Sequence, residues 1–133
     1  MANIAQAMQK AMLDWALGGA TPGAPAGRFA GISLAAPTSV SSNEVATGSG
    51  CSRQSASFQA AQTPSGSGSA SNTSAMTFGP FSSSAVCSGL FLADSVSSGA
   101  GTGLFYGNFA TARTPLPGDY IIIAVGALTI TLT

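Results

Sequence analysis

The C-terminal segment, residues 118–133, places the strongest constraint on how this chain can fold. A turn signal at 118–119 is followed by the β-branched run 121–123, and apolar and polar residues then alternate strictly over 128–133. A period of two puts Ile130 and Leu132 on one face of a half-buried strand and the threonines on the other. The pattern predicts a terminal strand that pairs within a sheet or across subunits of an assembly.

Short stretches with strand-like patterns recur along the rest of the chain, separated by segments rich in Gly, Ser and Pro. The predicted strands are residues 28–35, 51–58, 76–78, 88–93 and 104–110, with one or two more within 120–133. Residues 37–50 and the low-complexity stretch 62–71 are predicted loops, the second of them flexible. Such spacing is typical of an all-β fold, and we predict an antiparallel β-sandwich or small barrel with an N-terminal α-helix.

The N-terminal helix is predicted over residues 1–19, ahead of a β domain over 28–133, within a single compact domain overall. Asn3 can cap this helix, and Gln6 stands at the spacing of a capping box. Glycines 18 and 19 provide a stop. The apolar stripe of the helix consists of Ile4, Met8, Met12 and Trp15, and Leu13 and Leu17 widen it. This stripe either packs on the chain's own sheet or docks on a neighbouring subunit, so the helix is a candidate anchor, and Ile130 and Leu132 are candidate interface residues on the terminal strand.

Composition narrows the range of partners. Only 6% of the 133 residues are charged, and four basic side chains balance four acidic ones, whereas about 25% is typical. No basic stripe is available for phosphates, which argues against direct nucleic-acid binding. No apolar run approaches the roughly 18 residues of a transmembrane helix, so no membrane partner is expected. A surface so poor in charge favours self-association unless partners cover it.

Residues for catalysis are scarce in this sequence. The chain has no histidine, which removes the usual acid–base group at neutral pH and most zinc sites. No G-x-S-x-G elbow occurs, and the only lysine, Lys10, lies on the predicted helix rather than in a phosphate-binding loop. We therefore predict that the protein is not an enzyme and has no catalytic residues, cofactor or metal.

Two cysteines and two arginines remain as candidate structural groups. Cys51 and Cys87 are expected to be free buried thiols because the N-terminus does not resemble a signal peptide; a disulfide is the alternative if their Cα atoms come within about 7 Å. Arg53 and Arg113 are expected to fix loops by pairing with Glu44 or Asp119, within one subunit.

The order of short motifs resembles a family of small structural proteins of tailed bacteriophages, often labelled tail fibre proteins. The matching segments are residues 11–19, 32–38, 43–45, 51–54, 71–78, 89–94, 104–107, 112–114, 118–119 and 126–132. The resemblance covers nearly the whole chain, and none of these motifs carries chemistry. It implies a virion protein that assembles in the host cytoplasm.

Three functions fit these observations. The first is a capsid decoration or cement protein, expected as a trimer that binds the major capsid protein or another virion protein and stabilises the shell. The second is a tail, neck or fibre-associated structural protein. The third is a receptor- or glycan-binding module on the virion surface, for which an exposed cluster of Tyr106, Phe109 and Tyr120 would be the expected signature.

Overall fold

The computed structural model describes residues 3–38, 42–45, 47–63 and 66–132. The elements are β1 (Asn3–Ile4), α1 (Gln6–Ala16), β2 (Phe29–Ser33), the 3-10 helix η1 (Thr47–Ser49), β3 (Gln54–Ser55), β4 (Gly68–Ser71), β5 (Met76–Phe78), β6 (Cys87–Ala93), β7 (Gly103–Arg113), β8 (Ile121–Ile123) and β9 (Thr129–Leu132). The predicted all-β class with one N-terminal helix is confirmed.

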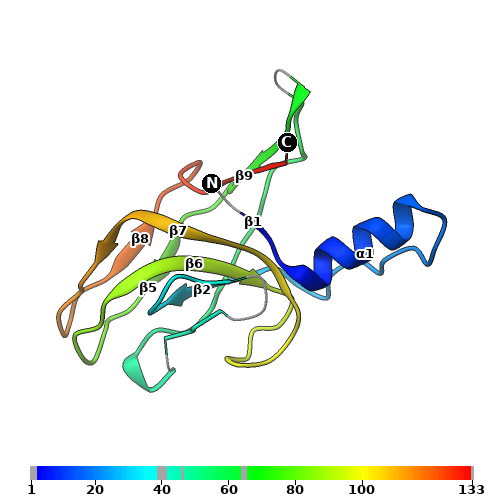
Figure 1. Ribbon diagram of the computed structural model, residues 1–133. Coiled ribbons are helices and arrows are strands. Elements are labelled where there is room, and N and C mark those ends of the chain that lie inside the picture. Colours follow the sequence, from blue (N-terminus) through cyan, green and yellow to red (C-terminus); the bar gives the residue numbers. More distant parts are fainter. Residues whose placement is uncertain (1–2, 39–41, 46, 64–65, 133) are drawn as a thin grey trace.

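The strands form open antiparallel sheets arranged as two layers (Figure 1). One layer is a five-stranded sheet in the order β1-β7-β6-β2-β3, and the other contains the pairs β5–β8 and β4–β9. β6 and β7 form the longest pairing and β2 lies on the other side of β6. The predicted antiparallel sandwich is therefore confirmed.

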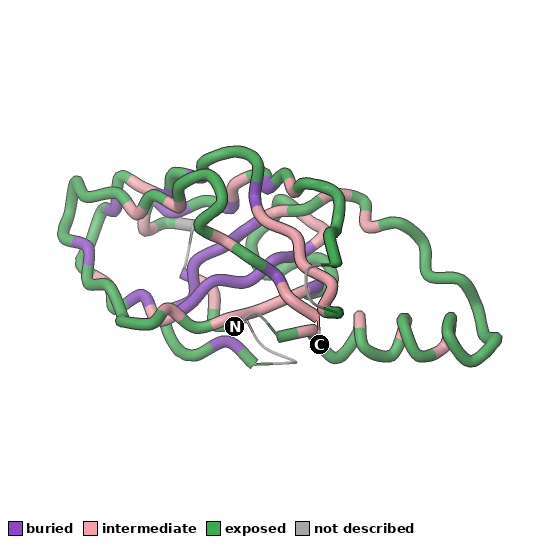
Figure 2. The backbone as a smooth tube through the Cα atoms, turned by 90° about the horizontal axis from the view of Figure 1, so that it is seen from above, coloured by how far each residue is buried: buried purple, intermediate pink, exposed green. Residues whose placement is uncertain are grey.

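The core lies between these layers, and Figure 2 shows buried residues concentrated along the central strands. Nearly every residue of β2 and β6 is buried, because both strands have neighbours at each edge and are covered on both faces. The larger core side chains are Ile32, Val45, Met76, Phe78, Phe81, Leu90, Leu92, Leu104 and Ile130. They come from both layers, so the layers share one core.

The start of the chain differs from the prediction. Asn3 is not a helix cap: it lies in β1, opposite Tyr106 of β7. The residue before the helix is Ala5, which is buried and whose N–H donates to the carbonyl of Leu104 at 3.0 Å. The helix begins only at Gln6, with no side-chain cap, and ends at Ala16. A short strand pairing with a distant part of the chain has replaced the local capping box.

Three loop and strand predictions are also corrected. The expected flexible loop 62–71 contains β4, which pairs with β9 from Gly68↔Leu132 to Ser71↔Thr129; residues 64–65 lie outside the described residues. The strand predicted over 51–58 is reduced to β3, because only Gln54 and Ser55 pair with β2. The polar excursion 37–50, of which 39–41 and 46 are not described, contributes Val45 to the core.

Candidate interaction surface

A group of exposed apolar side chains lies on and just after α1. Figure 1 shows this helix extending away from the β domain, and Figure 2 shows that it and the following linker are almost wholly exposed. Leu13 and Trp15 are each 60% exposed, Leu17 is 82% exposed and Met12 is 37% exposed. We call these four residues the α1 surface.

The helix that carries the α1 surface has few interactions that stabilise it. No residue of α1 is buried, it has no acidic residue in its first turn and no basic residue in its last. An isolated helix shorter than about 12–15 residues is marginal in water, and helices in proteins gain most of their stability from packing. Leu13 and Leu17 lie on the side opposite Met12 and Trp15, so apolar groups surround the end of the helix. Such a helix is typically covered by protein.

The structure divides the predicted helix stripe into two parts. Ile4 lies in β1 opposite Phe105, and Met8 is half-buried against the core. Met12 and Trp15, further along the helix, are instead exposed to solvent. Sequence analysis counted Leu13 and Leu17 only as widening this stripe and did not place them among the interface residues, although both are strongly exposed.

The terminal strand pairs within the chain. Ile130 of β9 is buried in the core and lies opposite Ala70 of β4, and Leu132 is half-buried opposite Gly68. The predicted alternation is therefore present. Through Ile130, β9 packs into the core that the two layers of one subunit share.

A buried ion pair fixes the loops at one end of the sandwich. Nε of Arg53 donates to Oε1 of Glu44 at 2.8 Å, and Nη2 donates to Oε2 at 2.9 Å. Nη1 donates to the carbonyls of Ser95 and Ala100 at 2.6 and 3.0 Å. Only 3% of the Arg53 side chain and 9% of the Glu44 side chain are exposed. The predicted pairing with Glu44 is confirmed, and the two carbonyls attach a third segment to the pair.

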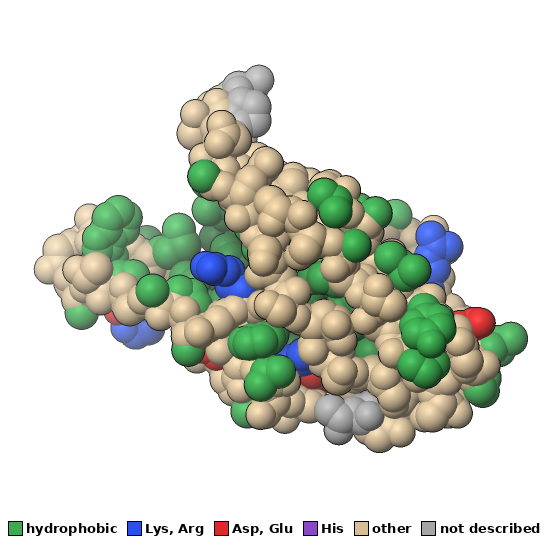
Figure 3. Space-filling model, turned by 180° about the vertical axis from the view of Figure 1, so that it is seen from behind, with side chains coloured by type: hydrophobic (Ala, Val, Ile, Leu, Met, Phe, Trp, Pro, Cys, Tyr) green, Lys and Arg blue, Asp and Glu red, His purple; other side chains and the backbone are tan. Residues whose placement is uncertain are grey.

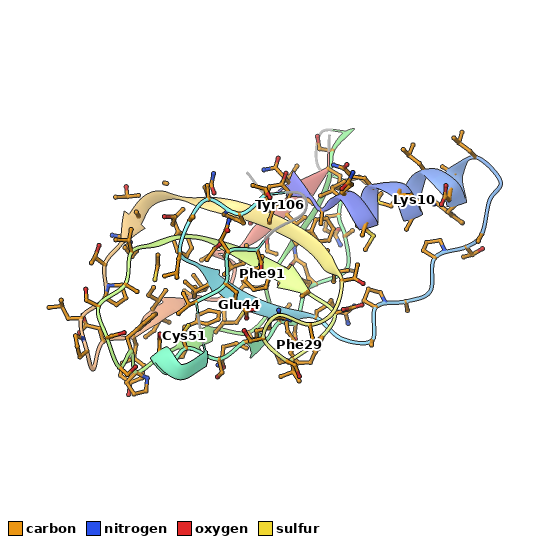
Figure 4. All side chains as sticks on the ribbon, turned by 60° about the horizontal axis from the view of Figure 1, so that its bottom comes forward. Lys10, Phe29, Glu44, Cys51, Phe91 and Tyr106 are labelled. Atoms are coloured by element: carbon orange, nitrogen blue, oxygen red, sulfur yellow. The ribbon has the colours of Figure 1, made fainter. Side chains whose placement is uncertain are left out.

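Phe91 and Gly99 complete this network, and Figure 4 shows Phe91 close to Glu44. The guanidinium carbon of Arg53 lies 5.2 Å from the ring centroid of Phe91, within cation–π range. The N–H of Gly99 donates to Oε2 of Glu44 at 3.0 Å. Burial by itself raises the pKa of Glu44, but the hydrogen bonds from Arg53, Gly99 and Ser98 and the charge of Arg53 outweigh it, so its pKa lies below the ordinary value.

Arg113 behaves differently from Arg53. It is the last residue of β7 and is exposed, and it forms no ion pair among the described residues. Asp119 accepts a hydrogen bond from the N–H of Leu116 at 2.9 Å instead. The ion pair that was expected for this arginine is absent from the described part of the chain.

Sequence analysis missed Asn72, which joins β4 to the turn before β9. Its side chain is buried and donates to the carbonyls of Ser74 and Ala124 at 2.8 and 2.9 Å. Its Oδ1 accepts from the N–H of Leu128 at 2.9 Å. All of its hydrogen-bonding groups are thereby occupied, as a buried amide requires. A lone asparagine after a Ser-rich stretch gave no signal for this role.

Cys51 and Cys87 are free and buried in the shared core. Burial, followed by the nearby charges of Cys87 and Glu44, raises the pKa of Cys51 to about 11. Burial also raises the pKa of Cys87. Both groups are therefore protonated at neutral pH, which makes them unreactive as nucleophiles.

The exposed aromatic cluster that would mark a receptor- or glycan-binding module does not form. Tyr106 and Phe109 are half-buried on β7, where they line an apolar cavity of about 320 Å³ between the two layers. Tyr120 is 55% exposed and lies in the loop before β8. The structure therefore separates Tyr120 from the other two rings.

Together, these features define a structural module: a small β-sandwich with a fixed core and an exposed apolar helix. No three or more metal-ligating side chains come together in the described ranges. Likewise, no helix found in the described ranges is both long and apolar enough to cross a membrane.

The family model described as podophage GP4 fiber I protein gp80 matches residues 3–131, and the chain belongs to this family. No curated protein matches the sequence. The resemblance to phage tail fibre proteins is confirmed, and the protein is a structural component of a phage virion.

Proposed function

We propose that this protein is a structural subunit of a phage tail-fibre assembly and that α1 attaches it to a neighbouring virion protein. The observation that carries the proposal is the α1 surface, which leaves Leu13, Trp15 and Leu17 mostly in solvent on a helix without buried residues. Large exposed apolar groups mark interaction sites, and aromatic anchors such as tryptophan contribute strongly to binding at protein interfaces. The match to a fibre protein family supports the tail location.

Capsid decoration is the second candidate, because a helix of this kind would equally attach the domain to a shell. Self-association, with the trimer as our first expectation, is compatible with either position, since the net charge of zero gives copies no reason to repel one another. The copy number relative to the major capsid protein, measured by quantitative mass spectrometry of purified virions, separates the two locations. A few to a few dozen copies per particle support the fibre, and a ratio near one or a third supports the shell.

Attachment through α1 is tested by replacing Leu13, Trp15 and Leu17 with serine. We expect incorporation into particles to fall at least tenfold, because the anchor loses its apolar contact area, while the thermal midpoint of the isolated protein changes little. Incorporation is measured by mass spectrometry of particles from complemented infections.

The matched control replaces Leu116, Val96 and Val125 with serine. These three residues are 59–62% exposed and lie outside the helix and the strands. Equal incorporation of the two triple variants, both folded, would contradict attachment through α1.

A further inference from the structure

A second surface lies at the far end of the β domain from α1. The loop between β7 and β8 borders a groove of about 370 Å³, within the range of sites for small ligands. Its lining residues are Arg113, Thr114, Pro115, Asp119, Tyr120, Ile121 and Ile122. Figure 3 shows, at this end of the molecule, apolar side chains gathered beside a basic and an acidic group.

The loop that carries the groove is fixed by hydrogen bonds. The N–H of Asp119 donates to the carbonyl of Leu116 at 3.0 Å across a turn with Pro117 and Gly118 at its centre. Gly118 has φ +92°, and Pro followed by a glycine with positive φ is typical of a type II turn. The N–H of Leu116 donates back to the Asp119 carboxylate at 2.9 Å. This carboxylate is therefore positioned before any ligand arrives.

The aromatic ring of the groove is also held in place. A β-carbon built on Gly79 would lie 3.2 Å from Cδ1 of Tyr120 and 2.7 Å from the carbonyl oxygen of Asp119. The Tyr120 ring thus rests against the backbone at Gly79, and more than half of the residue is exposed. Gly79 has φ +122°, which also favours glycine at this position.

The three side chains offer distinct and complementary contacts. The Arg113 guanidinium is exposed and has no ion-pair partner in the described part of the chain, so its planar fork is available to a carboxylate. The Asp119 carboxylate accepts hydrogen bonds from hydroxyl groups. The Tyr120 ring gives an apolar face with a polar tip, against which the C–H face of a sugar ring can lie.

We propose that this groove binds an acidic saccharide, a sugar unit that carries a carboxylate. In this arrangement Tyr120 supports the ring, Arg113 pairs with the carboxylate and Asp119 accepts from the hydroxyls. A neutral sugar would leave the guanidinium without its partner, and a purely apolar protein surface would leave both charged groups unpaired. The proposal goes beyond attachment through α1 and uses the opposite end of the molecule.

The test is an NMR titration of the ¹⁵N-labelled protein with tetragalacturonate. We expect amide shifts confined to residues 113–122 and a dissociation constant on the order of 1 mM, as expected for a small open site. Tyr120→Ala and Arg113→Ala should each weaken binding at least tenfold. Arg28→Ala is the matched control, because Arg28 is exposed beside the α1 end of the molecule, and it should bind as the unmodified protein does.

Three outcomes would overturn the proposal. The first is the absence of shifts around the groove up to roughly ten times that concentration. The second is equal binding of a neutral tetrasaccharide, or binding that Arg113→Ala leaves unchanged. The third is loss of particle incorporation by the folded Tyr120→Ala variant without any saccharide binding, which would make the groove a protein contact. The α1 serine variant should still bind the saccharide, so failure of one proposal does not decide the other.

Discussion

Among single residues, Arg53 has the widest influence on the fold. It sits above Phe91, and the Phe91 ring in turn covers Gly31, its partner across the β2–β6 pair. A β-carbon at Gly31 would lie 2.3 Å from Cζ of that ring, so only glycine leaves room for it. The guanidinium, the ring and the glycine form a stack that passes from a loop into the central strands. The ion pair therefore orders the loops and also supports the sheet.

Replacing Arg53 with alanine should lower the free energy of unfolding by roughly 3–5 kcal/mol, because Glu44 would be left buried without its partner. Arg53→Lys should recover little of this loss, since an ammonium group cannot bind both carboxylate oxygens and two carbonyls in the same plane. Urea denaturation measures both effects. Arg113→Ala, at an exposed position, should change stability by less than about 0.5 kcal/mol. Equal effects at the two arginines would contradict this account.

The buried thiol of Cys51 makes stability depend on alkaline pH. Its pKa in the folded protein is raised to about 11, so the folded state retains a proton that the unfolded state has already lost above pH ~9. The thiol contributes on the order of 2 kcal/mol to the free energy of unfolding. This contribution is fully present below the pKa of the unfolded state and is lost as pH rises toward 11. Cys51→Ala should flatten the fall in unfolding free energy between pH 9 and 11, measured by urea denaturation. A slope that the substitution leaves unchanged would contradict this.

At the scale of secondary-structure elements, local patterns predicted well the strands that form the core. β2, β5, β6, β7 and the two C-terminal strands all lie in stretches that the sequence marks as strand-like, by alternation or, for β8, by a β-branched run. The strands that sequence analysis missed form by pairing with distant segments. In β1, Asn3 pairs with Tyr106, and in β4, Ala70 pairs with Ile130. A Gly/Ser-rich segment carries no strand signal of its own. The pairing of Arg53 with Glu44 could be expected in a chain so poor in charge. The hydrogen bonds from Arg53 to the carbonyls of Ser95 and Ala100 could not, because nothing in the sequence indicates that this loop lies beside it.

Asn72 tests how one side chain joins two elements. Asn72→Ala should lower the free energy of unfolding by roughly 2–4 kcal/mol, because its three side-chain hydrogen bonds are lost and the N–H of Leu128 loses its acceptor. Amide hydrogen exchange should show the largest loss of protection in β4 and β9. Asn108→Ala, at an exposed site on β7, is the control and should have little effect. Uniform loss of protection across the sheets would contradict a local role.

For the molecule as a whole, apolar contacts rather than charges should govern association. The described residues contain two ion pairs, and both lie within the chain, Lys10 with Asp14 on α1 and Arg53 with Glu44. Large exposed apolar side chains include the four of the α1 surface and two, Tyr120 and Ile122, that line the groove. Salt screens exposed charges but has little effect on apolar contacts at moderate concentration.

Concentration-dependent self-association should therefore change less than about threefold between 0.05 and 0.5 M NaCl. Sedimentation velocity at several protein concentrations measures it. The variant with serine at residues 13, 15 and 17 should remain a monomer over the same range. Association that weakens strongly with salt would indicate ion pairs between copies instead.

The attachment of α1 at both ends has a mechanical consequence. Before the helix, β1 pairs with β7, and after the linker the chain enters β2, which pairs with β6 over five residues. The helix and linker therefore form a protruding segment whose two ends both enter the same sheet. A force applied to this segment acts along β1 and β2. The hydrogen bonds that join these strands to β7 and β6 then resist the force together instead of breaking one after another. A subunit held in this way can bear tension by passing the load from β1 and β2 into their partners β7 and β6.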